Sequence, residues 1–382
     1  MKRGVVGVLV LLLMAGGVVF WLVKPNDDPP GGTTGGPTGG SKSSGVVKVT
    51  GTVGSEKKAF FDDPKVQEEL RQQGLEVSAQ SAGSWQMNDV KDGAAADFAF
   101  PASLPPAEAI QKDHGITGTP ARPFYSPLVV VAYKETAEIL KNNGLAARND
   151  AKVWTLTMDK FTSALMEGRT WEQLAPQNRP PELAGRIYLT TTDPDKSSSG
   201  ALYIAMASFL LNNKEAVQDE ATAQRIGKTL NEPFNRQGGM QSSTEQPFAD
   251  FVSGNGRPLV LAYESQALEL AAQGEKGELP DNMVVLYPDT VVVSDHSLVA
   301  FTPNGKRLAE ALVKDEKLQK LAVDHGFRPA TPPSVESPFK AHVAELNNGR
   351  TKNNFAFDPD LNLPKVALPK QEILLSLIKA TK

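Results

Sequence analysis

The sequence predicts an α/β fold in which a mostly parallel sheet carries helices on its faces. Short apolar or alternating runs of strand length recur along the chain, and longer segments with helical spacing separate them. Strands that alternate with helices in this way are typical of a parallel sheet. The 382 residues suffice for two domains of ordinary size, or for one domain that is split into two lobes.

Composition argues against several classes of function. The net charge is -4 and no block rich in Lys and Arg occurs, so we expect no nucleic-acid partner. The absence of cysteine excludes thiol catalysis, zinc–thiolate sites, disulfides and a lipidated N-terminal cysteine. We also expect no metal and no cofactor, because the histidines lie in separate segments without ligand spacing: His114, His296, His325 and His342.

The N-terminus has the pattern of a membrane anchor. Lys2 and Arg3 precede an uncharged run over residues 4–23, which is longer than the ~7 to 15 residue apolar core of a cleaved signal peptide. We predict that residues 1–24 form a single transmembrane signal anchor, with a cleaved signal as the alternative. The basic residues before the run place the globular part outside the cytoplasm, anchored to the cell membrane in a single pass. Residues 25–45, rich in Gly, Pro, Ser and Thr, are predicted to be a flexible linker.

The first half of the globular part alternates between strand and helix patterns. We expect strands over residues 46–53, 74–79, 95–100 and 125–133. The last of these is nearly continuous in apolar residues, as in a strand buried on both faces. Helical patterns cover residues 60–70, 137–141 and 154–165, and Asp63-Pro64 should interrupt the first of them.

The second half continues the alternation. We expect strands over residues 185–189, 258–263, 283–288, 290–295 and 298–301. Helices are expected after Ser199, over residues 213–232, from residue 264, and over residues 305–313 and 317–325. The tail over residues 330–369 reads as irregular because it is rich in proline, and residues 371–378 as a short amphipathic helix.

A serine cluster is the leading candidate for a binding site. Ser197, Ser198 and Ser199 lie where an apolar helix should begin, and a helix start presents unpaired N–H groups and the positive end of the helix dipole. Such a site can hold an anion or a hydroxyl-rich ligand. Simple helix capping is the alternative interpretation. Ser55 and Ser103 also follow predicted strands, where open sheets bind their ligands, and this shared placement favours a site.

Catalytic chemistry has little support. The chain has no Gly-x-Ser-x-Gly elbow, and Lys196 beside Ser197 lacks the spacing of a Ser-x-x-Lys pair. Because nothing supplies a base and an oxyanion hole together, we expect no enzyme, and a hydrolase ranks third among the functions considered. Glu264 follows a predicted strand and could bind a ligand, although a carboxylate at a helix start more often complements the helix dipole.

Six segments in order resemble a known family. They are residues 54–57, 97–103, 126–129, 193–203, 262–266 and 287–296. Together they resemble bacterial extracellular solute-binding proteins of the two-lobed periplasmic type, and most specifically the solute-binding domain that often precedes a von Willebrand factor A domain in bacterial surface proteins. The resemblance covers about residues 46–329.

This resemblance implies a two-lobed periplasmic-binding-protein fold. Lobe one would comprise residues 46–125 and 295–329, lobe two would comprise residues 134–282, and two hinge strands would lie near residues 128–133 and 291–294. Residues 330–382 would form the tail. The lobes would close on a small solute without chemistry, and an oxyanion is one candidate. The implied ligand-binding residues are Ser55, Glu56, Ser103, Ser126, Ser197, Ser198, Ser199, Tyr263 and Glu264.

The sequence departs from the family in two respects. It has no Asp-x-Ser-x-Ser metal motif of an A-domain, and it lacks the lipobox cysteine. The expected partners are therefore either an ABC permease or a von Willebrand A-domain protein. The alternative function is a surface assembly or protein-interaction module that uses the same fold with a vestigial cleft. No arginine lies within the six segments, which favours a neutral solute over phosphate.

Overall fold

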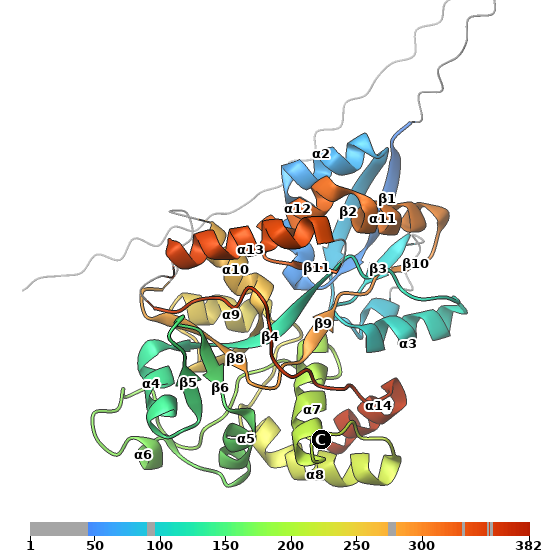
Figure 1. The fold of residues 1–382 in the computed structure, drawn as a ribbon. Coiled ribbons are helices and arrows are strands. Elements are labelled where there is room, and N and C mark those ends of the chain that lie inside the picture. The colour runs from blue at the N-terminus through green and yellow to red at the C-terminus, as the bar shows by residue number, and fades with distance from the viewer. Residues whose placement is uncertain (1–44, 90–95, 274–279, 331–332, 350, 352–353) are drawn as a thin grey trace, which may run out of the picture. The chain divides into compact units, whose positions relative to one another are not determined.

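The computed structural model describes residues 45–89, 96–273, 280–330, 333–349, 351 and 354–382. The predicted membrane anchor, and the predicted linker up to residue 44, lie outside these residues. Within the described ranges, no helix combines the length and the apolar character that a membrane crossing needs. The described chain builds two sheets, which we call the small sheet and the large sheet (Figure 1).

The small sheet has the strand order β10-β3-β1-β2. Strand β1 (Val47–Val53) pairs in parallel with β2 (Leu75–Ser81) and β3 (Phe98–Phe100), and β10 (Val299–Ala300) runs antiparallel to β3. One face packs against α1 (Lys58–Asp62), α2 (Pro64–Gln72), α11 (Pro303–Lys314) and α12 (Glu316–Asp324) to form the small core. Helix α3 (Leu104–His114) packs on β10 through Ala107 and Ile110. The predicted break between α1 and α2 is confirmed, because Asp63 caps α2 by accepting from the Lys65 N–H.

The large sheet is organised around one long strand, β4 (Phe124–Tyr133). Its order is β11-β4-β8-β6-β5, and two more strands pair with β4 off this path. These strands are β5 (Ala146–Arg148), β6 (Trp154–Leu156), β7 (Leu259–Tyr263), β8 (Met283–Pro288), β9 (Val293–Asp295) and β11 (Arg328–Pro329). All partners of β4 run antiparallel to it. The expectation of a mostly parallel sheet is therefore wrong for the large sheet, because every strand that pairs with its central strand β4 runs antiparallel to it.

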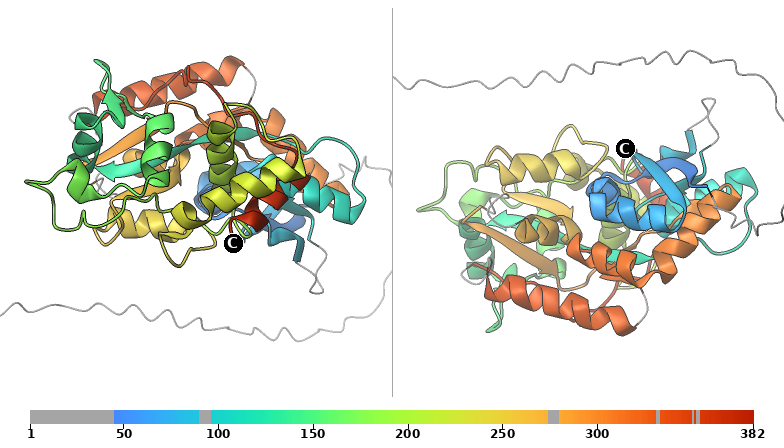
Figure 2. Two further views of the ribbon diagram at one scale, coloured as in Figure 1. Left: turned by 90° about the horizontal axis from the view of Figure 1, so that it is seen from below. Right: turned by 90° about the horizontal axis from the view of Figure 1, so that it is seen from above.

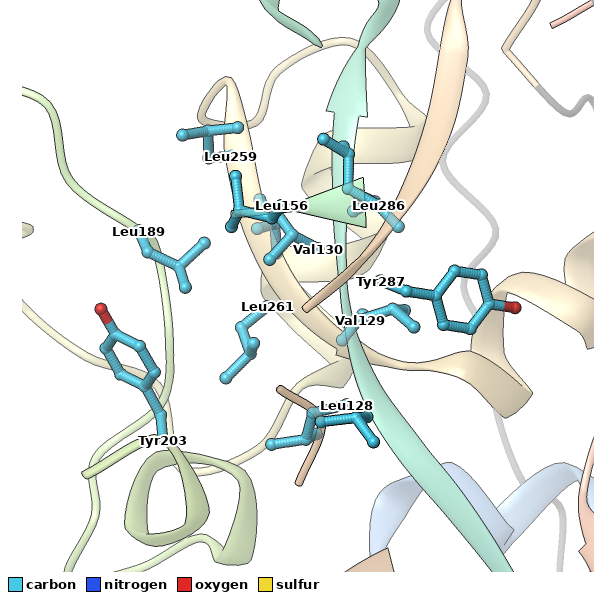
Figure 3. Packing of buried hydrophobic residues seen from close by; sticks show 14 of the residues in the cluster. Leu128, Val129, Val130, Leu156, Leu189, Tyr203, Leu259, Leu261, Leu286 and Tyr287 are labelled. Carbon is cyan, nitrogen blue, oxygen red and sulfur yellow. The ribbon is translucent and has the colours of Figure 1, made fainter. Parts of the chain in front are cut away.

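The large core surrounds β4 and its neighbours. Figure 3 shows Leu128, Val129 and Val130 of β4 among apolar side chains from β6, β7 and β8. The covering helices are α4 (Lys134–Asn142), α5 (Met158–Met166), α6 (Trp171–Leu174), α7 (Ser198–Leu211), α8 (Glu220–Asn235), α9 (Glu245–Val252) and α10 (Glu264–Ala272). Helix α7 is buried on every side from Ser198 to Phe209, as expected for a helix whose residues are apolar apart from three serines.

Two segments cross side by side between the cores. On β4, Phe124 belongs to the small core and Leu128 to the large core. The second segment contains β9 and runs antiparallel to the first, with Val292 in the large core and Leu298 in the small core. The first crossing covers residues 124–128, just before the hinge strand expected near residues 128–133, and the second covers residues 292–298, which overlap the one expected near residues 291–294. The hinge itself stays a prediction.

Three other expectations for single elements are wrong. Residues 154–165 form strand β6 and then helix α5, because Trp154 and Leu156 extend the large sheet before the helix begins. Residues 185–189 form no strand and make only isolated bridges near their ends, at Arg186 and Thr190. The helix expected from residue 213 begins at Glu220, where Asp219 caps it by accepting from the Thr222 N–H.

The tail is not irregular as predicted. Helix α13 (Pro333–Asn348) packs on α12 and α10, and helix α14 (Gln371–Ala380) packs on α8 and α7 (Figure 2). Gly227 of α8 permits the close approach of α14, because a Cβ atom there would collide with Ala380. Tail side chains complete the large core, among them Phe339, Val343, Phe355, Phe357, Leu374 and Leu377. Burial of these side chains outweighs the helix-breaking tendency of prolines in α13.

Candidate functional site

A hydroxyl group from the small-sheet part of the structure contacts one from the large core. Ser103 lies between β3 and α3 of the small sheet, and Ser198 is the first residue of α7 in the large core. Their Oγ atoms are 2.7 Å apart, which is a hydrogen bond, and both side chains are buried. The structure thus brings together two predicted site residues that are 95 positions apart in the chain.

The residues on either side of Ser198 form a second set of hydrogen bonds at the start of α7. The Ser199 Oγ lies 2.7 Å from Thr192 Oγ1 and 3.0 Å from Ser197 Oγ. The Gly200 N–H donates to Thr192 Oγ1 over 2.9 Å. Ser197 is the N-cap residue, but within the described residues its hydroxyl makes no capping hydrogen bond. Its hydroxyl instead joins the other hydroxyls, so capping alone does not account for this serine.

Tyr263 joins the same network at the end of β7. Its hydroxyl interacts with the side chains of Ser199 and Ser294, which act to lower its pKa, but burial is the larger effect and raises the pKa of Tyr263 well above its ordinary value. The Ser294 hydroxyl also donates to the Ala102 carbonyl. We call the whole group the hydroxyl cluster, and it comprises Ser103, Thr192, Ser197, Ser198, Ser199, Tyr263 and Ser294.

A buried charged group lies beside the hydroxyl cluster. The Lys57 ammonium pairs with Glu56 and lies 3.0 Å from His296 Nδ1, and all three side chains are buried. Burial alone would raise the pKa of Glu56, but Lys57 and His296 lower it to about 2. Burial and the Lys57 charge lower the pKa of His296 to about 4, so its ring is neutral at neutral pH. His296 Nε2 has no hydrogen-bond partner among the described residues, and the ring lies 5.7 Å from that of Tyr263.

Sequence reasoning missed Lys57 and His296 as parts of this group. Both lie within segments that carry the resemblance, residues 54–57 and 287–296, but the two are 239 positions apart. What distinguishes them is their burial, which depends on the packing of distant segments, and no spacing in the sequence indicates that they meet.

Glu264 is placed apart from the hydroxyl cluster. Its side chain is fully buried and accepts two hydrogen bonds from Arg328, from Nε over 2.6 Å and from Nη2 over 2.8 Å. It also accepts from the Tyr287 hydroxyl. This carboxylate therefore holds β11 against the start of α10. Arg328 in turn donates to the carbonyls of Asp358 and Pro359 in the tail.

Ser126 and Ser55 also lie outside the hydroxyl cluster. The Ser126 hydroxyl accepts from the Ser265 N–H over 3.0 Å and so supports the first turn of α10. The Ser55 hydroxyl is buried without a partner among the described residues. Ser55 and Glu56 line a pocket of about 370 Å³ that lies between α1 on one side and α9 and α10 on the other. Glu245, Phe248 and Gln266 line its opposite wall.

Among the described residues, no cluster of three or more His, Cys, Asp or Glu side chains could hold a metal ion. The site consists of hydroxyl groups, each of which can both donate and accept a hydrogen bond, and of the Lys57–Glu56 ion pair beside them. This arrangement suits reversible hydrogen bonding to a polar molecule.

Comparison with known proteins places the fold. No protein-family model matches the sequence, and no curated protein matches it significantly. Among solved structures, iron-bound HitA from Pseudomonas aeruginosa is similar, with 13% identity, a TM-score of 0.52, and coverage of 88% of this chain and 99% of that one. A putative spermidine/putrescine ABC transporter from Listeria monocytogenes has 14% identity, a TM-score of 0.52 and coverage of 87% and 97%. The periplasmic binding protein P5PA has 12% identity, a TM-score of 0.50 and coverage of 87% and 97%.

The chain therefore has the mixed α/β, two-sheet fold of periplasmic binding proteins. At these identities the likeness concerns the fold, so the ligand must be argued from the residues of this chain.

Proposed function

We propose that this chain is a solute-binding protein whose two lobes close on a small polar solute without chemistry. The observation that carries the proposal is the 2.7 Å contact between the hydroxyls of Ser103, which follows β3 of the small sheet, and Ser198, which begins α7 in the large core. Separation of the two lobes about β4 and β9 would free these hydroxyls for a ligand. Ser103 in one lobe and Ser198 in the other would then contact the ligand from opposite sides.

The charge of the hydroxyl cluster favours a neutral, hydroxyl-rich solute. In the described part of the chain the cluster contains no Arg or Lys, and the adjacent Lys57 is paired with Glu56. A multiply charged anion would leave most of its charge without a counterion in a buried site, which is costly. An oxyanion is the competing ligand class, since the start of α7 provides a favourable dipole.

A thermal-shift panel tests this proposal. Neutral sugars and polyols, amino acids, and sulfate, phosphate and molybdate are added in turn to the full chain. A ligand at a hundredfold its dissociation constant stabilises the folded state by about 2.7 kcal/mol. Ser198→Ala should abolish the shift, whereas Ser208→Ala should retain it, because Ser208 lies in the same helix but bonds the Ala205 carbonyl. The absence of a shift with every compound would reject the proposal, and a shift with oxyanions alone would reject the neutral ligand class.

We also propose that the N-terminal segment anchors the protein and that the globular part lies outside the cytoplasm. The support is the uncharged run over residues 4–23 behind two basic residues. Fusions of alkaline phosphatase and of a cytoplasm-active reporter after residue 45 test the orientation. An ABC permease is the proposed partner, and stimulation of its ATPase by the loaded protein is the corresponding assay.

A surface assembly module with a closed, vestigial cleft is the second candidate. The observation that favours it is the mutual pairing of the hydroxyl cluster, which leaves its hydroxyls bonded to one another. In this case no solute would shift the melting temperature, and a von Willebrand A-domain protein would be recovered with the chain from the cell envelope.

A further inference from the structure

His325 links the two cores through two hydrogen bonds. It is the C-cap residue of α12, whose Leu321 and Ala322 belong to the small core and whose Val323 belongs to the large core. Its Nε2 lies 3.0 Å from Asp63 at the start of α2, and its Nδ1 lies 2.8 Å from Glu269 of α10. The neighbours of Glu269 on α10, Leu268 and Ala271, belong to the large core. One imidazole ring therefore spans the contact between α2 and α10.

Tight packing holds the ring at this position. The next residue, Gly326, has a φ of 78°, and a Cβ atom there would lie 2.5 Å from the Ser265 carbonyl oxygen of α10. The ring of Phe60 contacts the imidazole edge-on at 5.7 Å between centroids. The side chain of His325 is 14% exposed, so it cannot turn into solvent without separating these elements.

Hydrogen bonding to both carboxylates requires a proton on each ring nitrogen. A neutral imidazole has one N–H, so it donates to one carboxylate and turns a lone pair toward the other. Burial lowers the pKa of His325, but hydrogen bonds to Glu269 and Asp63 outweigh it and raise the pKa above the ordinary 6.5. The doubly bonded state is therefore complete below pH 6.5 and is lost as the pH rises through the raised value.

Several of the charged groups on the elements around the ring are paired with other groups. Around α2 and α12, Lys58 pairs with Asp62 and Lys317 with Glu69, while the Lys65 N–H donates to Asp63. Arg328 pairs with Glu264 at β11 and the start of α10. Asp324 precedes His325 and is exposed. Helix α13 packs on α12 and α10 and carries Lys340, which pairs with Asp360, together with His342 and Glu345.

We propose that His325 is a proton-dependent clasp that ties the small core to the large core by bonding Asp63 and Glu269 at once. At low pH the protonated ring donates to both carboxylates, and this opposes separation of the two lobes. Alkalinisation releases one of the two carboxylates and makes separation easier. The clasp itself acts on the fold and does not require a ligand; its effect on solute affinity rests on the proposed function.

Histidine NMR and hydrogen exchange of the full chain test the clasp without any ligand. We expect His325 to titrate above 6.5, and Glu269→Gln to lower that value. Protection of amides in α2 and α10, corrected for intrinsic exchange, should fall about tenfold between pH 5.5 and pH 8.5, as expected for loss of one charge-assisted hydrogen bond. His325→Gln should remove this dependence, whereas the exposed His114→Gln should keep it.

Two results would overturn the clasp. One is a titration of His325 at or below 6.5 in the wild-type chain. The other is an unchanged pH dependence of protection in Glu269→Gln, which keeps the ring and the shape of the site and so serves if His325→Gln fails to fold. Glu245→Gln on α9 is the matched carboxylate control and should change neither measurement. Because these measurements contain no solute, failure of the proposed function would leave their outcome intact.

Discussion

Replacement of Arg328 by methionine should strongly destabilise the protein. The variant Arg328→Met keeps a long apolar stem but leaves the Glu264 carboxylate buried, with only the Tyr287 hydroxyl as a donor among the described residues. It also removes the donors to the carbonyls of Asp358 and Pro359. Loss of one partner of a buried ion pair costs about 3–5 kcal/mol. That is a large share of the roughly 5–15 kcal/mol by which domains are stable.

Removal of both charges should recover most of this loss. In the double variant Glu264→Met with Arg328→Met, no buried charge remains without a partner, and apolar replacements of buried pairs are often neutral. Urea unfolding at pH 7, followed by circular dichroism, measures both effects. Arg186→Met is the control, because its pair with Glu232 is more than half exposed and should contribute about 0–1 kcal/mol.

Two outcomes would refute this reasoning. A loss below about 1 kcal/mol in Arg328→Met would mean that the pair is not desolvated as the geometry indicates. A double variant as unstable as the single one would mean that the two residues do not act as a unit. The double variant also tests the sequence-based assignment of Glu264 to the ligand. If the carboxylate is structural, the folded double variant keeps its ligand-induced thermal shift.

Three further outcomes follow from the tail and the buried charges. Truncation after Ala330 removes several fully buried apolar side chains, each worth about 1.5–3 kcal/mol, so the shortened chain should show no cooperative urea transition. Gly227→Val should lower the free energy of unfolding by about 1–3 kcal/mol because α14 is displaced, whereas Gly239→Val, with open space around it, should not. Glu56→Gln should lower the free energy of unfolding by about 3 kcal/mol at neutral pH, because the pKa of Glu56 is lowered from 4.5 to about 2 in the folded chain. As the pH falls from 4.5 to about 2, the difference in unfolding free energy between the variant and the wild type should shrink, and equilibrium unfolding at each pH measures it.

Much of the fold could be predicted because its strands and caps have local signals. The apolar run at 125–133 is strand β4, and Asp63-Pro64 separates two helices as expected. The errors have a common physical cause. Trp154 and Leu156 fit a helical period as well as a strand, and only pairing with β8 decides between them. The prolines of α13 indicate a break, but the buried Phe339 and Val343 are held by tertiary packing that the local sequence does not show.

The candidate site was predictable where residue types cluster. Ser197 to Ser199 are adjacent in the sequence, and the expectation that they lie near Ser103 rests on the rule that strand ends gather at one edge of a sheet. The structure brings Ser103 and Ser198 together in another way, because residues 185–189 form no strand and Ser103 follows β3 of the small sheet while Ser198 begins α7. The partners of Glu56 and Glu264 could not be predicted in the same way. Lys57 and Arg328 look like surface cations in the sequence, and their burial emerges only when distant segments pack. The ligand-binding roles themselves stay predictions.

The end of the tail offers an unobtrusive place to observe the site. Lys382 pairs with Asp195, in the loop that leads into Ser197. A fluorophore on residue 382 would therefore lie beside the loop that leads into the hydroxyl cluster without replacing any of the cluster's residues. Its brightness or anisotropy should change when that loop moves. The pair of Lys382 with Asp195 thus makes the chain a scaffold for a biosensor in which occupancy is read at residue 382.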